Sequence, residues 1–216
     1  MTFQVNRYQL DGDNDYLSVA GDRSQRIATT SIRQPPPGDA PKNEVTTTSI
    51  KFEDYDLAGM HFTAQAYHQD FEALFGSDIF DSFQDPAIAP VGTLYDQSQT
   101  SSIKKGAKFT LTKDDLLQDK LTLTAGMDIL HDTTEQELAA TNRSWVPETT
   151  FKNYAPFLQA QFKPVDMLVV NAGIRHEKAK LDVDDFHTIH STNGAGGVDV
   201  AGGKPDFSET LYNAGI

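Results

Sequence analysis

The sequence contains no cysteine, which excludes a disulfide framework and thiolate metal sites. It has no run of 18 or more apolar residues, so it has no candidate transmembrane helix. Cations are also scarce, because 18 Lys and Arg stand against 31 Asp and Glu, for a net charge of -13. Since phosphate binding along a nucleic acid needs clustered Lys and Arg, the sequence argues against a nucleic-acid partner.

Apolar residues are fewer than an ordinary soluble core needs. They make up 38% of the 216 residues, whereas a soluble domain usually has about 45–50% on a count that includes glycine. A barrel with a wet lumen and wet external loops would show this shortfall, and so would a loop-rich soluble protein. The acids between the predicted strands are most simply explained by solubility. They include Glu135, Glu137, Asp184 and Asp185.

The segment DKLTLTAGMDILH, residues 119–131, alternates strictly with a period of two. One face carries Leu121, Leu123, Ala125, Met127 and Ile129, and the other carries Thr122, Thr124, Gly126 and Asp128. This pattern predicts a strand that is apolar on one side and polar on the other. Soluble strands usually have about 5–6 residues, whereas a strand that crosses a bilayer needs about 9–11. The length of this segment therefore favours a membrane β-barrel.

The same pattern recurs along the chain and predicts an all-β antiparallel meander. We expect nine strands, at residues 2–9, 15–21, 43–55, 60–72, 99–112, 119–131, 153–163, 167–182 and 208–216. Short connections are expected at 11–14, 57–59, 113–118 and 163–166, and long ones at 21–42, 74–98, 132–152 and 183–207. Short turns that alternate with long loops are typical of outer-membrane barrels. Long structureless loops count against a compact soluble domain.

Neighbouring strands give consistent faces. Within 153–163, Tyr154, Leu158, Ala160 and Phe162 share one face, and Phe157, Gln159 and Gln161 share the other. Within 167–178, Leu168, Val170, Ala172 and Ile174 lie opposite Asn171, Gly173, Arg175 and Glu177. In such a barrel the apolar set meets lipid and the polar set lines the lumen.

Residues 155–177, APFLQAQF followed by a KPVD turn and MLVVNAGIRHE, resemble the barrel of TonB-dependent outer-membrane receptors. In that family a strand with the pattern FxQ precedes one that ends in GxR followed by Tyr or His. The matching residues here are Phe157, Gln159, Gly173, Arg175 and His176. LTLTAGMDI (121–129) and FSETLYNAGI (207–216) resemble two further strands of the family. The resemblance covers about residues 43–216 and is greatest to ferric-siderophore receptors.

The resemblance implies a 22-stranded barrel in the bacterial outer membrane, with an N-terminal plug in its lumen. It implies uptake of a ferric siderophore, energised by the TonB complex acting through the plug. Outer-membrane lipid is then a partner, and iron enters as a chelate rather than as a resident cofactor. Because the start lacks the features of a signal peptide and the end stops inside a strand pattern, we expect residues 1–216 to be part of the barrel domain, without the plug and the C-terminal strands.

Two groups of residues are candidates for ligand binding, and no catalytic or resident metal residue is expected. Arg143 and Trp145 in the predicted loop 132–152, with Tyr95 and Phe186 in two other loops, would suit an anionic iron chelate. The predicted lumen contributes the second group, which consists of Gln159, Gln161, Arg175 and Lys108. Loop residues His187 and His190 would be candidates if haem were the ligand.

Two other functions are compatible with the strand pattern. A passive outer-membrane channel without TonB coupling would share every strand feature, because only an upstream plug distinguishes it. A soluble secreted β-protein with one buried face would also show alternation. Strands and loops of this length count against the soluble alternative.

Overall fold

The computed structural model describes residues 1–216 except 13–17, 20–23, 26–29, 32–37, 77–82 and 190–196. Its described strands are β1 (Thr2–Asp11), β2 (Ser18–Val19), β3 (Thr30–Ser31), β4 (Lys42–Asp54), β5 (His61–Leu74), β6 (Ser98–Leu116), β7 (Leu121–Leu138), β8 (Ser144–Val165), β9 (Leu168–Val183), β10 (Phe186–His187), β11 (Asp199–Val200) and β12 (Asp206–Gly215). No helix among the described residues is long and apolar enough to span a membrane.

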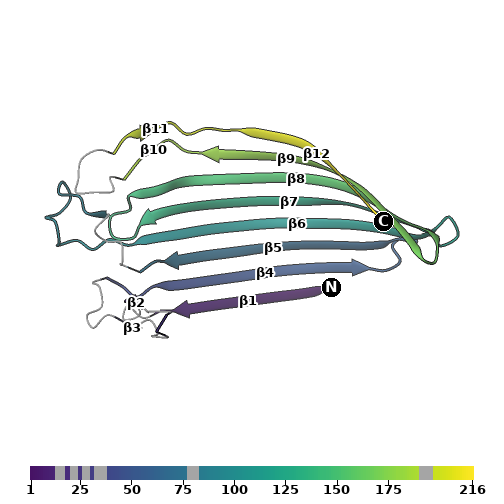
Figure 1. Ribbon diagram of the computed structural model, residues 1–216, viewed down its shortest axis with the longest axis horizontal. Helices are drawn as coiled ribbons and strands as arrows, with labels where there is room; N and C mark the ends of the chain where they lie inside the picture. Colours follow the sequence, from purple (N-terminus) through teal and green to yellow (C-terminus); the bar gives the residue numbers. More distant parts are fainter. Residues whose placement is uncertain (13–17, 20–23, 26–29, 32–37, 77–82, 190–196) are drawn as a thin grey trace.

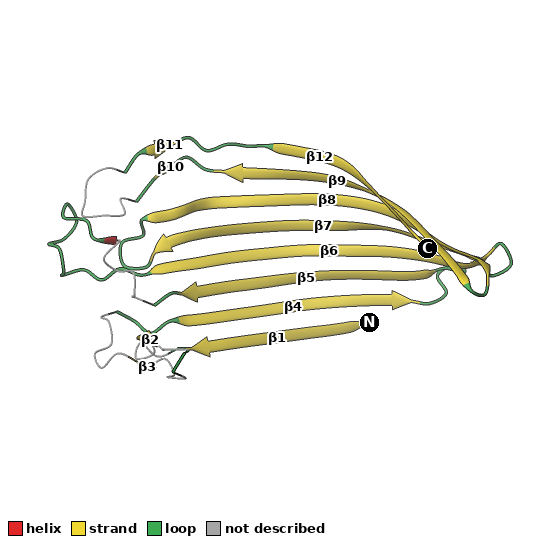
Figure 2. Cartoon of the chain, viewed as in Figure 1, coloured by secondary structure: helices red, strands yellow, loops and turns green. Residues whose placement is uncertain are grey.

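Eight strands form one antiparallel sheet in the order β1-β4-β5-β6-β7-β8-β9-β12. Within this sheet, each strand pairs with the one that follows it along the chain. The short strands β2–β3 and β10–β11 form two separate pairs, which lie within the long connections. Figure 1 shows the strands side by side in a single layer, with the long connections together at the left and the tight turns at the right. We call these the long-loop end and the short-turn end. The all-β meander predicted from the sequence is confirmed, as the colouring by secondary structure in Figure 2 shows.

The strand register extends the predicted faces from one strand to the next. One row runs through Phe62, Leu111, Ala125, Leu158, Ile174 and Tyr212, each opposite the next. A second row, three register positions away and on the other side of the sheet, runs through Gln65, Lys108 and Asp128. We call these sides the apolar face and the polar face. The side-chain alternation seen in single strands therefore continues across six strands, β5 to β9 and β12.

Side chains on the polar face cover one another more than those on the apolar face. In β9, Ile174, His176 and Lys178 are exposed, whereas Arg175 and Glu177 between them are partly covered. Side chains on the inner side of a curved sheet converge, so the polar face is the concave one. This curvature is the geometry of a barrel wall with a polar lumen.

The predicted strand at 15–21 is wrong as a member of the main sheet. Within it only Ser18 and Val19 are described, and they pair with β3 instead. β1 pairs directly with β4, from Thr2 opposite Lys51 to Asp11 opposite Lys42. The short turn predicted at 11–14 is therefore part of a long connection, some of which lies outside the described residues. The ladder of ten residue pairs between β1 and β4 leaves no place in the main sheet for a strand between them.

The long loop predicted at 132–152 is also wrong. β7 continues to Leu138 and β8 begins at Ser144, so only a tight turn separates the strands. Asn142 in this turn has a φ of 52°, a left-handed conformation that asparagine tolerates. The extension was not apparent in the sequence because its residues are polar on both faces, as at Thr134, Glu135 and Gln136. Backbone pairing continues there without any apolar alternation to indicate it.

Glycines on the polar face make room for rings on the neighbouring strand. A Cβ on Gly106 would lie 2.3 Å from the Tyr67 ring, and one on Gly126 would lie 2.4 Å from the Phe157 ring and 2.5 Å from the backbone oxygen of Phe109. Tyr67 is opposite Gly106 in the register, and Phe157 is opposite Gly126. Such aromatic side chains cover the glycine of a neighbouring strand and pin the register.

We predict different costs for two glycine substitutions. Gly106→Ala should destabilise the intact receptor by about 1 kcal/mol because only the Tyr67 ring must turn away, and Tyr67→Ala should then restore most of the loss. Gly126→Ala should cost about 1–3 kcal/mol because backbone is also in contact, and Phe157→Ala should restore only part of it. Urea-dependent folding into lipid vesicles measures both. Equal and fully reversible costs would show that the backbone contact has no effect.

Candidate functional site

Two consecutive buried residues before β6 organise the long-loop end. Asp96 is 1% exposed and Gln97 is 5% exposed. The Asp96 carboxylate accepts hydrogen bonds from the backbone N–H of Ala140, at 2.8 Å, and from the Thr141 hydroxyl. Asp96 therefore holds the β7–β8 turn against the β5–β6 connection. Full pairing of this kind is what a buried carboxylate requires.

Gln97 fastens a second connection to the same point. Its side chain donates to the backbone oxygen of Asp39, at 2.9 Å, and to that of Phe75, at 2.8 Å, while its oxygen accepts from the Asp39 N–H. Its backbone oxygen accepts from the N–H of Ala139 at 2.9 Å. Three connections separated by up to a hundred residues are thus joined through one dipeptide. Below them lie Leu138 and Phe83, both buried.

Arg143 completes this cluster from the tip of the β7–β8 hairpin. Its guanidinium donates to the backbone oxygen of Phe83 at 2.7 Å and to the Thr141 hydroxyl at 2.9 Å. It also lies 3.6 Å from the Asp96 carboxylate and 3.8 Å from that of Asp85. Arg143 therefore ties the hairpin to the β5–β6 connection, and two carboxylates offset its charge.

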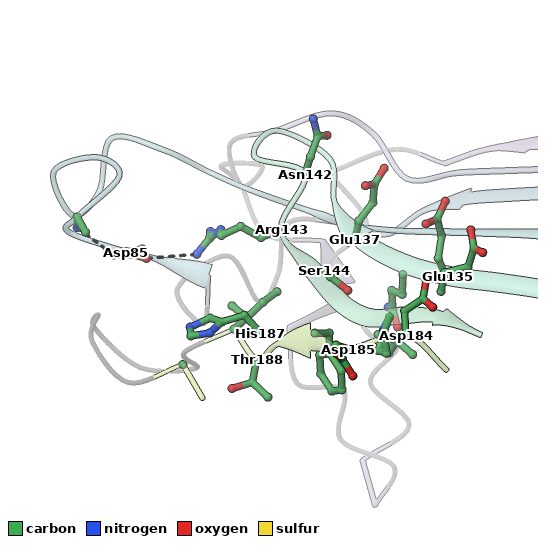
Figure 3. Close-up of a pocket in the computed structure, with 18 of the residues that line it drawn as sticks. Asp85, Glu135, Glu137, Asn142, Arg143, Ser144, Asp184, Asp185, His187 and Thr188 are labelled. Carbon is green, nitrogen blue, oxygen red and sulfur yellow. Dashed lines mark hydrogen bonds and ion pairs between the residues drawn. The ribbon is translucent and has the colours of Figure 1, made fainter. Parts of the chain in front are cut away.

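A cavity of about 730 Å³ lies beside Arg143 (Figure 3). Its walls come from the β7–β8 hairpin, the β5–β6 connection and the start of the β9–β12 connection. Six carboxylates are among its lining residues: Asp85, Glu135, Glu137, Glu148, Asp184 and Asp185. We call this space the outer cavity. Its size is that of a small-molecule site.

The charge of the outer cavity is strongly negative. Among the described residues that line the cavity, one is a lysine or an arginine, namely Arg143. Asp85 and Asp96 largely offset the charge of Arg143. His187 in the lining points Nδ1 at the Asp199 carboxylate, 2.8 Å away. Further along the same connection, a hydrogen bond from Lys204 to Asp182 raises the pKa of Lys204. The potential in this cavity favours cationic or neutral ligand groups over anionic ones.

Below the outer cavity, the polar face carries a charge network centred on Arg175. Its guanidinium lies 2.7 Å from the Asp128 carboxylate and also donates to Glu177. Glu177 accepts a further hydrogen bond from Asn153 at 2.8 Å. The guanidinium lies 5.8 Å from the centre of the Phe157 ring, within cation–π range. Three strands, β7, β8 and β9, are thereby linked on the concave side.

The structure groups the eight predicted site residues by location. Arg143 and Phe186 line the outer cavity, while Lys108, Gln159 and Arg175 line a second hollow of about 530 Å³ on the polar face. Gln159 and Gln161 line a further hollow of about 510 Å³ beside it.

The two remaining loop aromatics make contacts within the loops. The Trp145 ring packs edge-on against Phe83, with ring centres 4.6 Å apart. The Tyr95 hydroxyl donates to the backbone oxygen of Gly92 at 2.8 Å. The assignment of all eight residues to ligand binding stays a prediction. His190, the partner of His187 in the haem alternative, lies outside the described residues.

The acidic lining of the outer cavity was not predicted from the sequence. Glu135, Glu137, Asp184 and Asp185 were attributed to solubility because they lie in separate polar segments. Only tertiary structure brings the end of β7 next to the start of the β9–β12 connection. Asp96 was missed as well, since nothing in PVGTLYDQS indicates that its acid is buried. In the described part of the chain, no three His, Cys, Asp or Glu side chains converge as a metal site.

Comparisons with known proteins agree with this architecture. Residues 2–216 match the family described as TonB dependent receptor-like, beta-barrel. The chain is 25% identical over 236 aligned residues to a ferric aerobactin receptor of Klebsiella pneumoniae. The alignment covers 97% of this chain and 31% of that protein. The chain thus spans about a third of the length of this relative. No solved structure matches. The chain belongs to the TonB-dependent receptor family, an outer-membrane family of receptors and transporters, within whose β-barrel domain it aligns.

Proposed function

We propose that the protein to which this chain belongs takes up a ferric siderophore across the bacterial outer membrane, energised by TonB. The observation that carries the proposal is the division of six strands, β5 to β9 and β12, into one apolar and one polar face. The apolar face suits lipid and the concave polar face suits a lumen. The relative named as a ferric aerobactin receptor supports a ferric siderophore as the class of ligand.

Binding and transport fall to different parts of the structure in this proposal. The outer cavity lies at the long-loop end, where a chelate from outside would first arrive. The hollow around Lys108, Gln159 and Arg175 lies further along the concave face and offers hydrogen-bond donors to a passing chelate. No covalent chemistry is required, since uptake changes only the location of the iron. Energy from TonB would act through a plug domain that lies outside this chain.

Uptake of ⁵⁵Fe-loaded siderophores by cells that express the intact receptor tests the proposal. We expect saturable uptake that disappears in cells without TonB. Uptake that persists without TonB would instead establish a passive channel. Receptor that fractionates as a soluble protein, with no uptake, would support a secreted binding protein.

The acidic outer cavity predicts a preference among chelates. In contrast to the anionic chelate suggested by the loop aromatics and Arg143, a cationic or neutral ferric chelate should bind better there. Replacing Glu137 and Glu148 by glutamine should weaken a cationic chelate roughly two- to threefold per charge removed at low salt. Neither side chain makes an ion pair among the described residues, so the fold should be retained.

Tryptophan-fluorescence titration of the purified intact receptor measures this preference. Asp119→Asn combined with Asp166→Asn at the short-turn end is a matched control, because it also removes two charges, far from the cavity. Tighter binding of the cationic chelate by the double variant would show that the carboxylates do not attract the ligand.

A further inference from the structure

A border of basic residues follows the long-loop edge of the apolar face. On each of five consecutive strands, β5 to β9, a residue of basic type follows the central apolar residues of that face toward the long-loop end, although on β6 the exposed Ile103 lies beyond it. These residues are His68, Lys105, His131, Lys152 and His176. We call this set the basic border. On the flanking strands β4 and β12 the corresponding residues are Thr48 and Thr210.

The strand register makes the basic border continuous. Lys105 lies opposite both His68 and His131, and Lys152 lies opposite both His131 and Lys180. On β9 the series extends outward from His176 through Lys178 and Lys180 on the same face. Because neighbouring strands lie about 4.8 Å apart, five strands span about 19 Å.

The lysines of the basic border are available to a ligand. Lys105 and Lys152 of the basic border, and Lys178 beyond it on β9, are exposed and form no ion pair with any described residue. Such a group of unpaired cations is unexpected in a chain with a net charge of -13. At the short-turn end the charges are mixed and mainly acidic, with Asp54, Asp56, Asp114, Asp115, Asp119 and Asp166 near Lys113, Lys120 and Lys163.

Acidic residues lie outward of the basic border on its two end strands, β5 and β9. Asp70 lies two residues beyond His68 on the same face, Glu72 lies two beyond that, and Asp182 follows Lys180 on β9. His68 lies 3.0 Å from the Asp70 carboxylate. An anionic group would therefore be attracted to the narrow band between the apolar face and these acids, and repelled above it.

We propose that the basic border binds the phosphate groups of a glycolipid headgroup in the outer leaflet of the membrane. This inference rests on the proposed function, because it needs the apolar face to lie in lipid. Lysine stems can lie along the apolar face while their ammonium groups reach the headgroup level. Basic residues beside an anionic lipid surface each add to binding. A headgroup with more than one phosphate can engage several strands at once, whereas a singly charged phospholipid engages one or two.

Native mass spectrometry of the purified intact receptor, with diphosphoryl lipid A as the probe, tests the proposal. Lys105→Gln combined with Lys152→Gln should weaken lipid A binding on the order of tenfold. The matched control, Lys120→Gln with Lys163→Gln, removes the same charge at the short-turn end and should bind as the unmodified receptor does. Lys105→Arg with Lys152→Arg should retain binding, which separates loss of charge from misfolding.

Monophosphoryl lipid A and phosphatidylglycerol complete the comparison, and both should bind more weakly than the diphosphoryl form. Unchanged lipid A binding in the Lys105 and Lys152 glutamine variant, or an equal loss in the control, would overturn the proposal. Siderophore titration of the same samples separates the two proposals. Failure of the lipid proposal leaves siderophore binding intact, whereas failure of the proposed function leaves lipid binding without siderophore binding.

Discussion

Leu158→Arg is expected to prevent most of the intact receptor from assembling in the outer membrane. Leu158 lies near the middle of β8 on the apolar face, opposite Ala125 and Ile174, and is 47% exposed. An arginine there would put a charge near the bilayer midplane, which costs about 2–4 kcal/mol in membrane barrels. The measurement is the fraction of receptor in outer-membrane preparations that shows heat-modifiable migration on a gel.

The neighbouring residue provides the matched control. Gln159 lies on the polar face, opposite Thr124 and Gly173, so Gln159→Arg adds the same charge to the wet side of the sheet. We expect it to assemble normally. Opposite outcomes for two consecutive positions would follow only from the assignment of the two faces. If Gln159→Arg failed to assemble and Leu158→Arg did not, the apolar face could not be the lipid-facing one.

Asp96→Ala is expected to release the long-loop end without unfolding the sheet. Asp96 accepts hydrogen bonds from Ala140 and Thr141 and lies beside Arg143 while almost fully buried. Removing its carboxylate leaves the donors of Ala140 and Thr141 without this partner and leaves Asp85 alone to offset the charge of a mostly buried guanidinium, which costs about 3–5 kcal/mol. Amides of residues 138–146 should then exchange hydrogen about a hundredfold faster or more. The outer cavity should lose ligand affinity because two of its walls are no longer joined.

Asp85→Ala is the control for the second carboxylate near Arg143. Asp85 lies 3.8 Å from the guanidinium and is much more exposed than Asp96. Its removal should cost under about 1 kcal/mol, as for surface ion pairs. The central strands of the sheet should exchange at the same rate in both variants. Equal exchange at residues 138–146 in the two variants would show that burial of Asp96 has no special role.

The residues of the apolar face could be predicted from the sequence because the alternation that marks them lies within each single strand. Each strand there must place apolar side chains at alternate positions, whatever its neighbours are. Strands β7, β8 and β9 were accordingly predicted with the correct faces, as at Leu158 and Ile174. The polar network around Arg175 was predicted only as a set of lumen residues, because its pairing with Asp128 depends on the register across two strands.

The errors lie where no apolar alternation is required. The hairpin extension of β7 and β8 is polar on both sides, so the sequence there shows no apolar alternation that would indicate paired strands. The strand expected at 15–21 had a local pattern but no place in the sheet, because β1 already pairs with β4 over its whole length. Which strands pair depends on several segments that are distant in the chain, so the pattern of one segment does not show which partner it will have.

The sequence by itself determined the all-β class, the two faces and the family resemblance, since all three follow from short-range alternation and short motifs. Tertiary structure alone decided the outer cavity, the burial of Asp96 and the basic border. Each of these joins residues from connections or strands far apart in the chain, such as Asp85 with Arg143 or Lys105 with Lys152. Their proximity comes from strand register and loop packing, which are set by the free energy of the whole sheet.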